Sequence, residues 1–304
     1  MRTGNTKILS VLAKYLLFCT LISSCYSSPE FSDKKSQIDE LITIDKMNDS
    51  IIIIKLGYDA VTGILTPDGI VVIDAGISNS LTQKYRAIIE KELKGNHFAY
   101  LINTHGHHDH TGGNQVFSDA EIIGHEKCKI EISESQKDQA KVKSNYLKIT
   151  QQYEKKLQNL DSGSVGWKAA CCQKYRYQCA AEDMLNSRKI MLPTKTFRDS
   201  IHINVGNVNI DMMYVGKAHS ESDILIHIPE KNLLMVGDLF SGGGITHIQY
   251  EDKYDVKRWL QVKKWITDRM NRINIVIGGH GEIMGKEDMG YFLEWIENKM
   301  VETL

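Results

Sequence analysis

The sequence lacks an excess of charge of either sign. Its 304 residues include 37 Lys and Arg against 38 Asp and Glu, which leaves a formal net charge of −1, and no long basic run is present. Proteins that bind nucleic acid usually carry a basic patch or stripe, so the charge indicates no nucleic-acid partner. The chain also lacks the Cys-x-x-Cys-His motif of attached haem and shows no flavin motif. Haem and flavin chemistry are therefore not predicted.

The N-terminal region has the composition of a secretory signal peptide. Positive charges accompany an apolar stretch, Ile8–Ile22, which is followed by small residues. The stretch is short for a membrane span, so a signal peptide over residues 1–24 is favoured over an uncleaved anchor helix. Leu21-Ile22-Ser23-Ser24-Cys25 resembles a bacterial lipobox. We predict a protein of the periplasm or cell envelope, anchored to the membrane by a lipid on Cys25.

Residues 25–37 are predicted to form a linker, and residues 38–304 a domain. The linker is rich in serine, a composition typical of a flexible tether. The domain is long enough to bury a core without disulfides or metals. Outside the cytoplasm its four cysteines could pair in three ways, and they are Cys128, Cys171, Cys172 and Cys179. In a continuous helix Cys171 and Cys179 would lie about 12 Å apart, so joining them would require a break in that helix.

The first part of the domain has a regular order of predicted elements. Apolar runs over residues 61–65 and 70–73 flank Thr66-Pro67-Asp68-Gly69, which has the residues of a hairpin turn. A helix is predicted for Asn79–Gly95, with Ser80 capping its start and Gly95 its end. A strand over His97–Asn103 then leads directly into a cluster of histidines.

The second part repeats this order. Apolar runs over residues 224–228 and 233–236 predict a hairpin, residues 256–270 a helix, and residues 273–277 a strand that leads to His280. We interpret the repeat as a duplicated ββαβ unit. It predicts an α/β fold in which two sheets pack face to face with helices outside.

Residues 126 to about 195 interrupt this order. Lys141–Leu160 and Trp167–Met191 are helix-prone, and Asp161-Ser162-Gly163-Ser164 separates them. They predict a helical insertion. It could be a lid or a wall of a substrate pocket, or a packed cover outside the domain, and the sequence favours neither.

The strongest motif is Thr104-His105-Gly106-His107-His108-Asp109-His110, directly after a predicted strand. Imidazole nitrogens and carboxylate oxygens are ligands that suit zinc. A loop that leaves a strand can direct such side chains at two neighbouring points, and its glycines allow the backbone to turn tightly. The density of ligands predicts a metal site.

This His-x-His-x-Asp-His pattern resembles the metallo-β-lactamase superfamily, over about residues 40–300. The resemblance implies an αββα sandwich of two ββαβ-type halves with a helical insertion. It implies that a first metal ion is bound by His105, His107 and His219. It further implies that Asp109, His110 and His280 bind a second ion and that Asp238 bridges the two.

The ligand set resembles the branch that includes glyoxalase II and the lactonases. The order from Leu192-Pro193-Thr194 onward is similar to periplasmic hydrolases associated with quinoprotein systems. One departure is the loop His219–Asp223, which lacks the glycine that is common before its last aspartate. The shape of this loop is therefore left open.

The implied activity is hydrolysis of a small ester, thioester, lactone or amide. Two ions about 3.5–4 Å apart can hold a water molecule and lower its pKa, which supplies a hydroxide at neutral pH. Asp109 would be catalytic as well, because it can orient that hydroxide. Two Zn²⁺ ions are expected, although iron or manganese would also suit these ligands. His247 is a candidate substrate contact, and Asp74 is predicted to orient a ligand from behind.

Two alternatives are retained. One is a metallo-β-lactamase that hydrolyses β-lactam antibiotics. One subclass of these enzymes has Cys at the position of Asp238 and Lys three residues later, where this chain has Ser241, but another subclass uses only His and Asp. The other alternative is a non-catalytic or redox metal-binding protein of the cell envelope.

Overall fold

The structure, a computed structural model, describes residues 36–185, 191–241, 244–245 and 255–303. By its internal contacts the chain divides into two units, residues 1–40 and residues 41–304. In the first unit only residues 36–40 are described, and they are helical. The predicted signal peptide, Cys25 and the linker up to residue 35 lie outside the described residues. The second unit holds the elements described below.

The first sheet has seven strands in chain order. They are β1 (Thr43–Asn48), β2 (Ile51–Leu56), β3 (Asp59–Thr66), β4 (Gly69–Ile73), β5 (Phe98–Ile102), β6 (Glu121–His125) and β7 (Lys195–Phe197). Neighbours from β1 to β4 are antiparallel, and those from β4 to β7 are parallel. The predicted hairpin is confirmed, because Leu65 pairs with Ile70 and Thr66 with Gly69.

The second sheet has six strands in the order β15-β14-β11-β10-β9-β8. Their bounds are β8 (Ser200–Val205), β9 (Val208–Tyr214), β10 (Ile224–Ile228), β11 (Leu233–Gly237), β14 (Ile275–Gly278) and β15 (Ile283–Gly285). The predicted β10–β11 hairpin is confirmed, and β11 pairs in parallel with β14. A small third sheet pairs β12 (Phe240–Ser241) with β13 (Gly244–Ile245).

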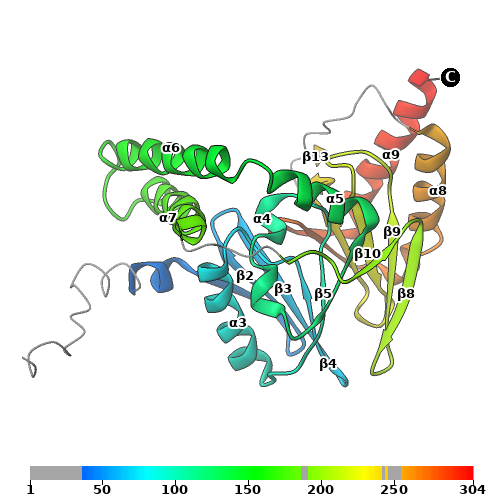
Figure 1. Cartoon of the computed structure of the whole chain (residues 1–304). Helices are drawn as coiled ribbons and strands as arrows, with labels where there is room; N and C mark the ends of the chain where they lie inside the picture. The colour runs from blue at the N-terminus through cyan, green and yellow to red at the C-terminus, as the bar shows by residue number, and fades with distance from the viewer. Residues whose placement is uncertain (1–35, 186–190, 242–243, 246–254, 304) are drawn as a thin grey trace, which may run out of the picture. The chain divides into compact units, whose positions relative to one another are not determined.

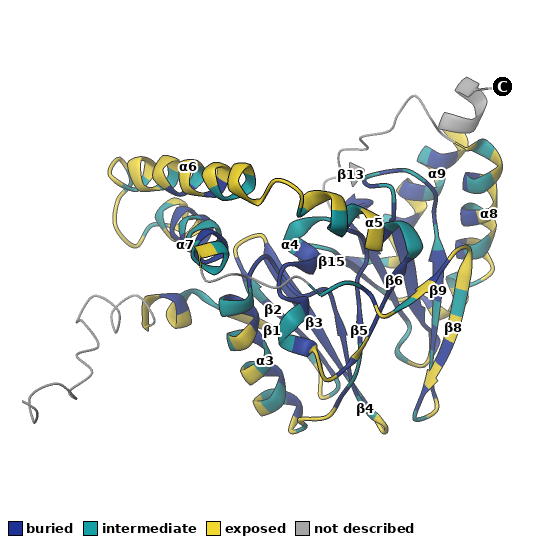
Figure 2. Ribbon diagram, viewed as in Figure 1, coloured by how far each residue is buried: buried dark blue, intermediate teal, exposed yellow. Residues whose placement is uncertain are grey.

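Alternating apolar side chains join the two large sheets. Ile51 and Ile53 of β2 share one buried cluster with Ile224 and Ile226 of β10, and all four are fully buried or nearly so. Ile52, between them, faces the opposite side of its sheet and is also buried. Figure 2 shows the central strands as the most deeply buried part of this unit, whereas the edge strand β8 is partly exposed. The first sheet is thus covered on both faces.

Helices cover the outer faces. The helix α3 (Asn79–Leu93) packs on β2 and β3, while α8 (Val256–Thr267) and α9 (Lys286–Thr303) share a second buried cluster with the other sheet. The α/β class and the αββα order are therefore confirmed (Figure 1). The repeated order also holds, because each half runs hairpin, helix, then a strand that leads toward a histidine.

The ends of α3 differ from the prediction. Ser78, not Ser80, caps the start, since its hydroxyl accepts a hydrogen bond from the Leu81 N–H. Lys94, not Gly95, takes the left-handed conformation at the end, with φ of 53°. Both caps lie within two residues of the predicted ones. Such shifts are expected because several nearby residues have the chemistry to cap.

The segment between β6 and β7 contains three long helices. They are α5 (Glu126–Ser135), α6 (Gln139–Leu157) and α7 (Val165–Leu185). The pair α6 and α7 pack on each other, α7 also contacts α3 and β2, and α6 turns a largely exposed side outward (Figure 2). The four cysteines of the domain are buried free thiols, so the considered disulfides are not formed.

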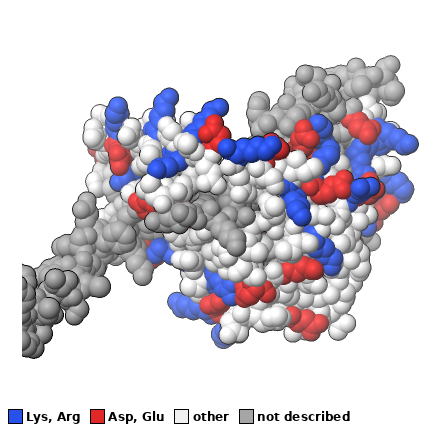
Figure 3. All heavy atoms as spheres, viewed as in Figure 1, with Lys and Arg blue, Asp and Glu red and all other residues white. Residues whose placement is uncertain are grey.

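The remaining short elements are α4 (His108–Thr111), η1 (Asn114–Phe117), η2 (Pro229–Lys231) and η4 (Met270–Arg272). Among the described helices, none is both long and apolar enough to cross a lipid bilayer. On the face drawn in Figure 3, basic and acidic side chains are interspersed.

Candidate metal centre

The candidate ligands lie just beyond the ends of four strands. The motif after β5 contributes four of them, on a loop and on α4, and β9, β11 and β14 are followed by one each. Both β9 and β14 run parallel to β11 within the second sheet, so their carboxyl ends meet at one edge. This arrangement explains how residues 219, 238 and 280 become neighbours.

The structure brings all seven predicted ligands together. Their ligand atoms form three overlapping groups, each within 4.8 Å. The groups are His105, His107 and His219; His105, His110 and Asp238; and Asp109, His110 and His280. The first and third groups coincide with the two ligand triads that the resemblance implied.

Asp238 lies between these triads. Its Oδ2 is 3.1 Å from His280 Nε2 and 3.4 Å from both His110 Nε2 and His219 Nε2. His105 Nε2 is 4.0 Å away. One carboxylate oxygen therefore faces nitrogens of both triads, as a bridging ligand would. The neighbouring backbone leaves room for this contact only because residue 279 is glycine, since a Cβ there would lie 2.2 Å from Asp238 Oδ1.

Asp74 lies behind the candidate ligands and is hydrogen-bonded to them directly or through Thr104. One oxygen accepts hydrogen bonds from His110 Nδ1 at 2.9 Å and from the Thr104 hydroxyl at 2.7 Å, and the other accepts from the Thr104 N–H at 2.8 Å. The Thr104 oxygen in turn lies 3.1 Å from His105 Nδ1. Because the threonine proton is directed at Asp74, His105 Nδ1 is placed to donate. Both histidines then turn Nε2 toward the cluster.

His280 follows the same pattern. Its Nδ1 lies 2.6 Å from the Tyr58 backbone oxygen, which leaves Nε2 for the cluster. Ligating histidines in metalloproteins usually donate their other ring N–H to a carboxylate or carbonyl in this way. His107 and His219 meet differently, with His107 Nδ1 3.0 Å from His219 Nε2, so these two nitrogens point at one place.

The buried nitrogens fit a metal ion. His105 Nε2 and His110 Nε2 are buried without a hydrogen-bond partner among the described residues. Burial and the neighbouring His110 lower the pKa of His105 well below its ordinary value. Burial also opposes charge on His110, but the carboxylates of Asp238 and Asp74 outweigh it and raise the pKa of His110 well above its ordinary value. A metal ion would satisfy both nitrogens and would displace a proton from His110.

Sequence analysis missed a cation in this cluster. Arg176 of α7 donates from Nη2 to Asp109 Oδ2 at 2.6 Å, and its Nε lies 3.7 Å from Asp59 Oδ1. The guanidinium is buried. No motif marks this arginine, because its place depends on how the insertion packs.

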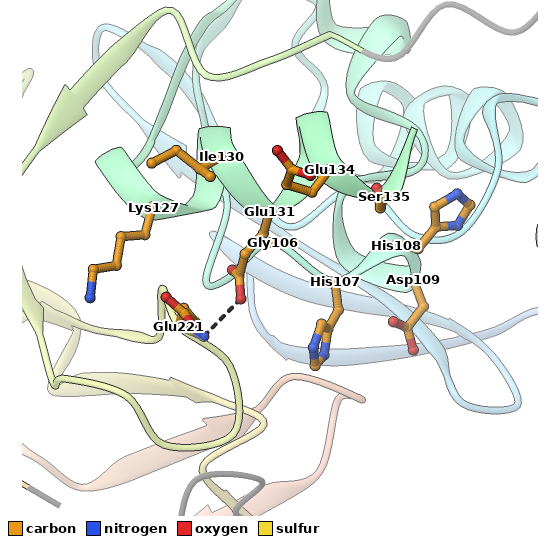
Figure 4. Close-up of a pocket in the computed structure, with 10 residues that line it drawn as sticks. All are labelled: Gly106, His107, His108, Asp109, Lys127, Ile130, Glu131, Glu134, Ser135 and Glu221. Carbon is orange, nitrogen blue, oxygen red and sulfur yellow. Dashed lines mark hydrogen bonds between the residues drawn. The ribbon is translucent and has the colours of Figure 1, made fainter. Parts of the chain in front are cut away.

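A cavity of about 660 Å³ opens beside the cluster. Figure 4 shows His107 and Asp109 on one side of it and α5 above them. Its lining is Gly106, His107, His108, Asp109, Lys127, Ile130, Glu131, Glu134, Ser135 and Glu221. The first helix of the insertion is therefore a wall of this cavity.

Two other histidines remain. His108 of the motif turns away from the cluster, and its Nδ1 contacts the Tyr146 hydroxyl of α6. His247, the candidate substrate contact, lies outside the described residues.

The loop after β9 is held by hydrogen bonds at the position where the family glycine is missing. Ser222 stands at that position; its hydroxyl accepts from the Gly106 N–H at 2.9 Å and donates to Glu131 of α5. Glu131 also accepts from the Glu221 N–H at 2.7 Å, the bond drawn in Figure 4. The serine thus ties the metal loop to the cavity wall.

Comparisons with known proteins agree with this geometry. The sequence model of the Metallo-beta-lactamase superfamily matches residues 60–280, a range that contains all seven clustered side chains. A metallo-beta-lactamase type 2 from Bacillus sp. (strain 170) is 24% identical over 296 residues, which are 93% of this chain and 95% of that protein.

Solved structures share the fold. A metallo-beta-lactamase from Pontibacter korlensis superposes with a TM-score of 0.53 at 15% identity, covering 84% of this chain and 99% of its own. A double mutant of the sec-alkyl sulfatase PisA1 superposes with a TM-score of 0.59 at 14% identity, covering 88% of this chain and 43% of its own.

Proposed function

Because the chain belongs to the metallo-β-lactamase superfamily, we propose that it is a hydrolase that holds two metal ions, Zn²⁺ in the first instance, and cleaves a small ester, thioester, lactone or amide. One observation carries the proposal: seven His and Asp side chains from both halves of the domain converge beside an open cavity. A structural protein would have no need of this arrangement.

The proposed ligands follow the geometric groups. His105, His107 and His219 would hold the first ion, and Asp109, His110 and His280 the second. Asp238 would contact both, since its Oδ2 faces nitrogens of each triad. Imidazole and carboxylate ligands suit zinc, and also iron and manganese.

Ions bound here would polarise the scissile carbonyl and acidify a water molecule. The chain itself positions the candidate ligands. Asp74 fixes the rings of His105 and His110, and Asp109 keeps Oδ1 on the side of His110 Nε2, at 3.9 Å. The cavity under α5 would receive the part of the substrate that does not react.

The charges of this cavity favour a substrate without an anionic group near α5. Glu131, Glu134 and Glu221 line it, and Lys127 is its one cation among the described residues. The Lys127 ammonium is engaged, donating to the Tyr214 hydroxyl at 2.9 Å. Two of the glutamates are themselves paired with lysines, Glu134 with Lys137 at 2.6 Å and Glu221 with Lys217 at 2.8 Å, so the lining has little net charge with which to hold a carboxylate or sulfate. Neutral esters, thioesters and lactones need no such charge.

A β-lactamase activity is the second candidate. The 24% identity to the Bacillus enzyme over 93% of the chain favours it. Two features oppose it as the main activity: the one lysine of the described cavity lining is engaged with Tyr214, and a serine stands at position 241 in place of a lysine that binds the drug carboxylate in one subclass.

The first experiment is to purify the domain without chelator, measure bound metal by elemental analysis, and assay a lactone, a glutathione thioester and a cephalosporin. Two ions per chain with turnover of a neutral acyl substrate are expected. Absence of bound metal at neutral pH would overturn the proposal, and preferential cleavage of the cephalosporin would establish the second candidate instead.

Asp109→Asn provides the matched test of mechanism. The amide keeps the size of the side chain but removes the charge that faces His110 and His280. We expect kcat to fall by at least about 100-fold while the protein keeps its fold. The same change at Asp45, whose carboxylate pairs with Lys55 on β1 and β2, is the control. Wild-type turnover by Asp109→Asn would contradict the dinuclear mechanism.

A further inference from the structure

A buried arginine of the insertion contacts the second triad. Arg176 lies near the middle of α7 and is 4% exposed. Its Nη2 donates to Asp109 Oδ2 at 2.6 Å. On its other side, Nε lies 3.7 Å from Asp59 Oδ1 and Nη1 lies 3.4 Å from the Gln173 side-chain oxygen. An arginine this deep in a protein requires partners for its charge, and here two carboxylates provide them.

Asp59 is itself fixed in place. It is fully buried, and it accepts hydrogen bonds from the Tyr85 hydroxyl at 2.8 Å and from the Ile77 N–H at 2.9 Å. Asp59 is the first residue of β3 and Tyr85 lies on α3, so the domain core holds this end of the network. The row Asp59, Arg176, Asp109 therefore joins the core, the insertion and the candidate metal centre.

The row leaves one negative charge in excess. The guanidinium is balanced by one carboxylate, so the second carboxylate keeps its charge for a cation. Without Asp59, the charge of Arg176 would oppose a metal ion bound at Asp109. Arg176 also occupies one oxygen of Asp109 only, since Oδ1 lies 3.9 Å from His110 Nε2.

We propose that Arg176 is a positioning residue for the second metal ion: it holds Asp109 Oδ2 so that Oδ1 faces His110 and His280, while Asp59 cancels the charge of the arginine. The inference rests on the proposed function. It also assigns a role to the insertion, whose helix α7 completes the second site, while α5 forms the wall of the cavity.

The test compares metal affinities of Arg176→Met and the wild-type protein by chelator competition and elemental analysis. Methionine keeps an apolar stem but cannot hold the carboxylate. Loss of such an outer partner typically weakens metal binding by about 10- to 100-fold. We expect that loss for the second ion only, with the first ion bound as in the wild type. Arg176→Lys should restore part of the affinity.

Cobalt replacement supplies a second readout. The absorption of Co²⁺ reports the ligands of each ion, so Arg176→Met should lose the signal of the second ion and keep that of the first. A purely structural role of Arg176 would weaken both ions alike and would overturn the inference. Arg86→Met is the control, because Arg86 also pairs with an aspartate, Asp119, outside the cluster.

Asp59→Asn tests the charge balance separately. The arginine stays, but its charge is no longer cancelled, so affinity for the second ion should again fall by about 10-fold or more. Unchanged affinity in this variant would overturn the balancing role, and unchanged affinity for the second ion in Arg176→Met would overturn the positioning role. A wild-type protein without metal would instead refute the proposed function, so the two failures are distinguishable.

Discussion

At the scale of single residues, Asp74 holds two candidate ligands in place, His110 directly and His105 through Thr104. Its carboxylate accepts from His110, from the Thr104 hydroxyl and from the Thr104 N–H, and it is buried with φ of 57°. Left-handed backbone is unusual for a residue other than glycine, although Asp and Asn tolerate it better than most. Because Asn tolerates this backbone conformation as Asp does, an Asp→Asn substitution changes the hydrogen bonds of the side chain without adding backbone strain.

Asp74→Asn should weaken metal binding by about 10- to 100-fold. The amide nitrogen is a donor. In one orientation it would face the histidine N–H and the threonine hydroxyl, and in the other the Thr104 backbone N–H, and all three groups also donate. Chelator competition on both proteins would measure the change. Asp211→Asn is the control, since Asp211 lies 2.8 Å from a histidine nitrogen, that of His202, outside the cluster. Equal losses in both variants would show that the effect does not depend on the ligand pair.

Asp223 gives the protein a pH-dependent stability. Complete burial raises the pKa of Asp223 to about 7, although the Ser220 N–H donates to it at 2.6 Å. The ordinary value, 3.8, applies to the unfolded chain. Between these values the folded protein holds a proton that the unfolded chain has lost. The contribution to stability is therefore full below pH 3.8 and is lost as pH rises through about 7.

The prediction concerns how steeply the free energy of unfolding changes with pH. The free energy of unfolding of the wild type, minus that of Asp223→Asn, should fall by about 1.4 kcal/mol for each pH unit across this window and stay level above it. Urea unfolding at a series of pH values measures it. Asp68→Asn, in an exposed turn, supplies the baseline. A difference that is flat with pH, or that rises, would show that Asp223 is not a buried acid.

The candidate ligands could be predicted from the sequence, whereas Arg176, which contacts one of them, and its partner Asp59 could not. The seven candidate ligands lie in short motifs after strands, where a local pattern can be recognised, and the structure gathers all of them. Arg176 and Asp59 belong to no motif, since they meet across 117 positions of the chain only after α7 has packed against β2 and α3. Contacts of this kind depend on tertiary packing, which periodicity cannot reveal.

At the scale of elements, the loop after β9 and the helix α5 act together. The Ser222 hydroxyl accepts from the Gly106 N–H and donates to Glu131, so one side chain links the ligand loop to the wall of the cavity. The loop shape, left open because a glycine is missing there, is set by these bonds. The hydroxyl supplies a fixed connection that a glycine would lack.

Ser222→Ala should lower the free energy of unfolding by about 1–3 kcal/mol, because it leaves a buried N–H without its acceptor. Urea denaturation would measure the loss, and the midpoint should shift without a change in slope. Ser133→Ala is the matched control, because that serine is partly exposed on α5 and bonds only to the backbone of its own helix. Equal stability of Ser222→Ala and wild type would show that the link contributes nothing.

Element order was predictable, whereas element ends were not. Hairpins, helices and strands in both halves follow from period and turn residues, and each was found in its place. The start of α3 moved by two residues because Ser78 and Ser80 offer the same capping chemistry, and its end moved by one residue to Lys94. The insertion was recognised as helical, but only the structure shows that α5 and α7 reach the candidate site.

At the scale of the whole molecule, the candidate centre lies where the two halves of the domain meet. The first triad takes His105 and His107 from one half and His219 from the other, and the second takes His280 from the far end of the chain. Ions bound at these triads would join the halves. Metal binding and the stability of the folded domain should therefore be coupled.

Removal of metal tests this coupling. A ligand that binds only the folded state adds about 4 kcal/mol when present at about 1,000 times its Kd. For a domain of this size, 1 kcal/mol corresponds to about 2–4 °C in Tm, so dialysis against a chelator should lower Tm by roughly 10 °C. Calorimetry would measure the shift. Because each triad spans both halves, the unfolding should remain one cooperative transition with metal bound.

The control is a variant that loses one ligand contributed by the second half of the domain. His219→Ala removes the only ligand of the first triad that comes from the second half. It should keep part of the Tm increase through the second triad, whereas a double change with His280→Ala should abolish it. If the chelator left the wild-type Tm unchanged, the ions would not stabilise the contact between the two halves. The candidate ligands would then meet between the halves only for the chemistry of the site.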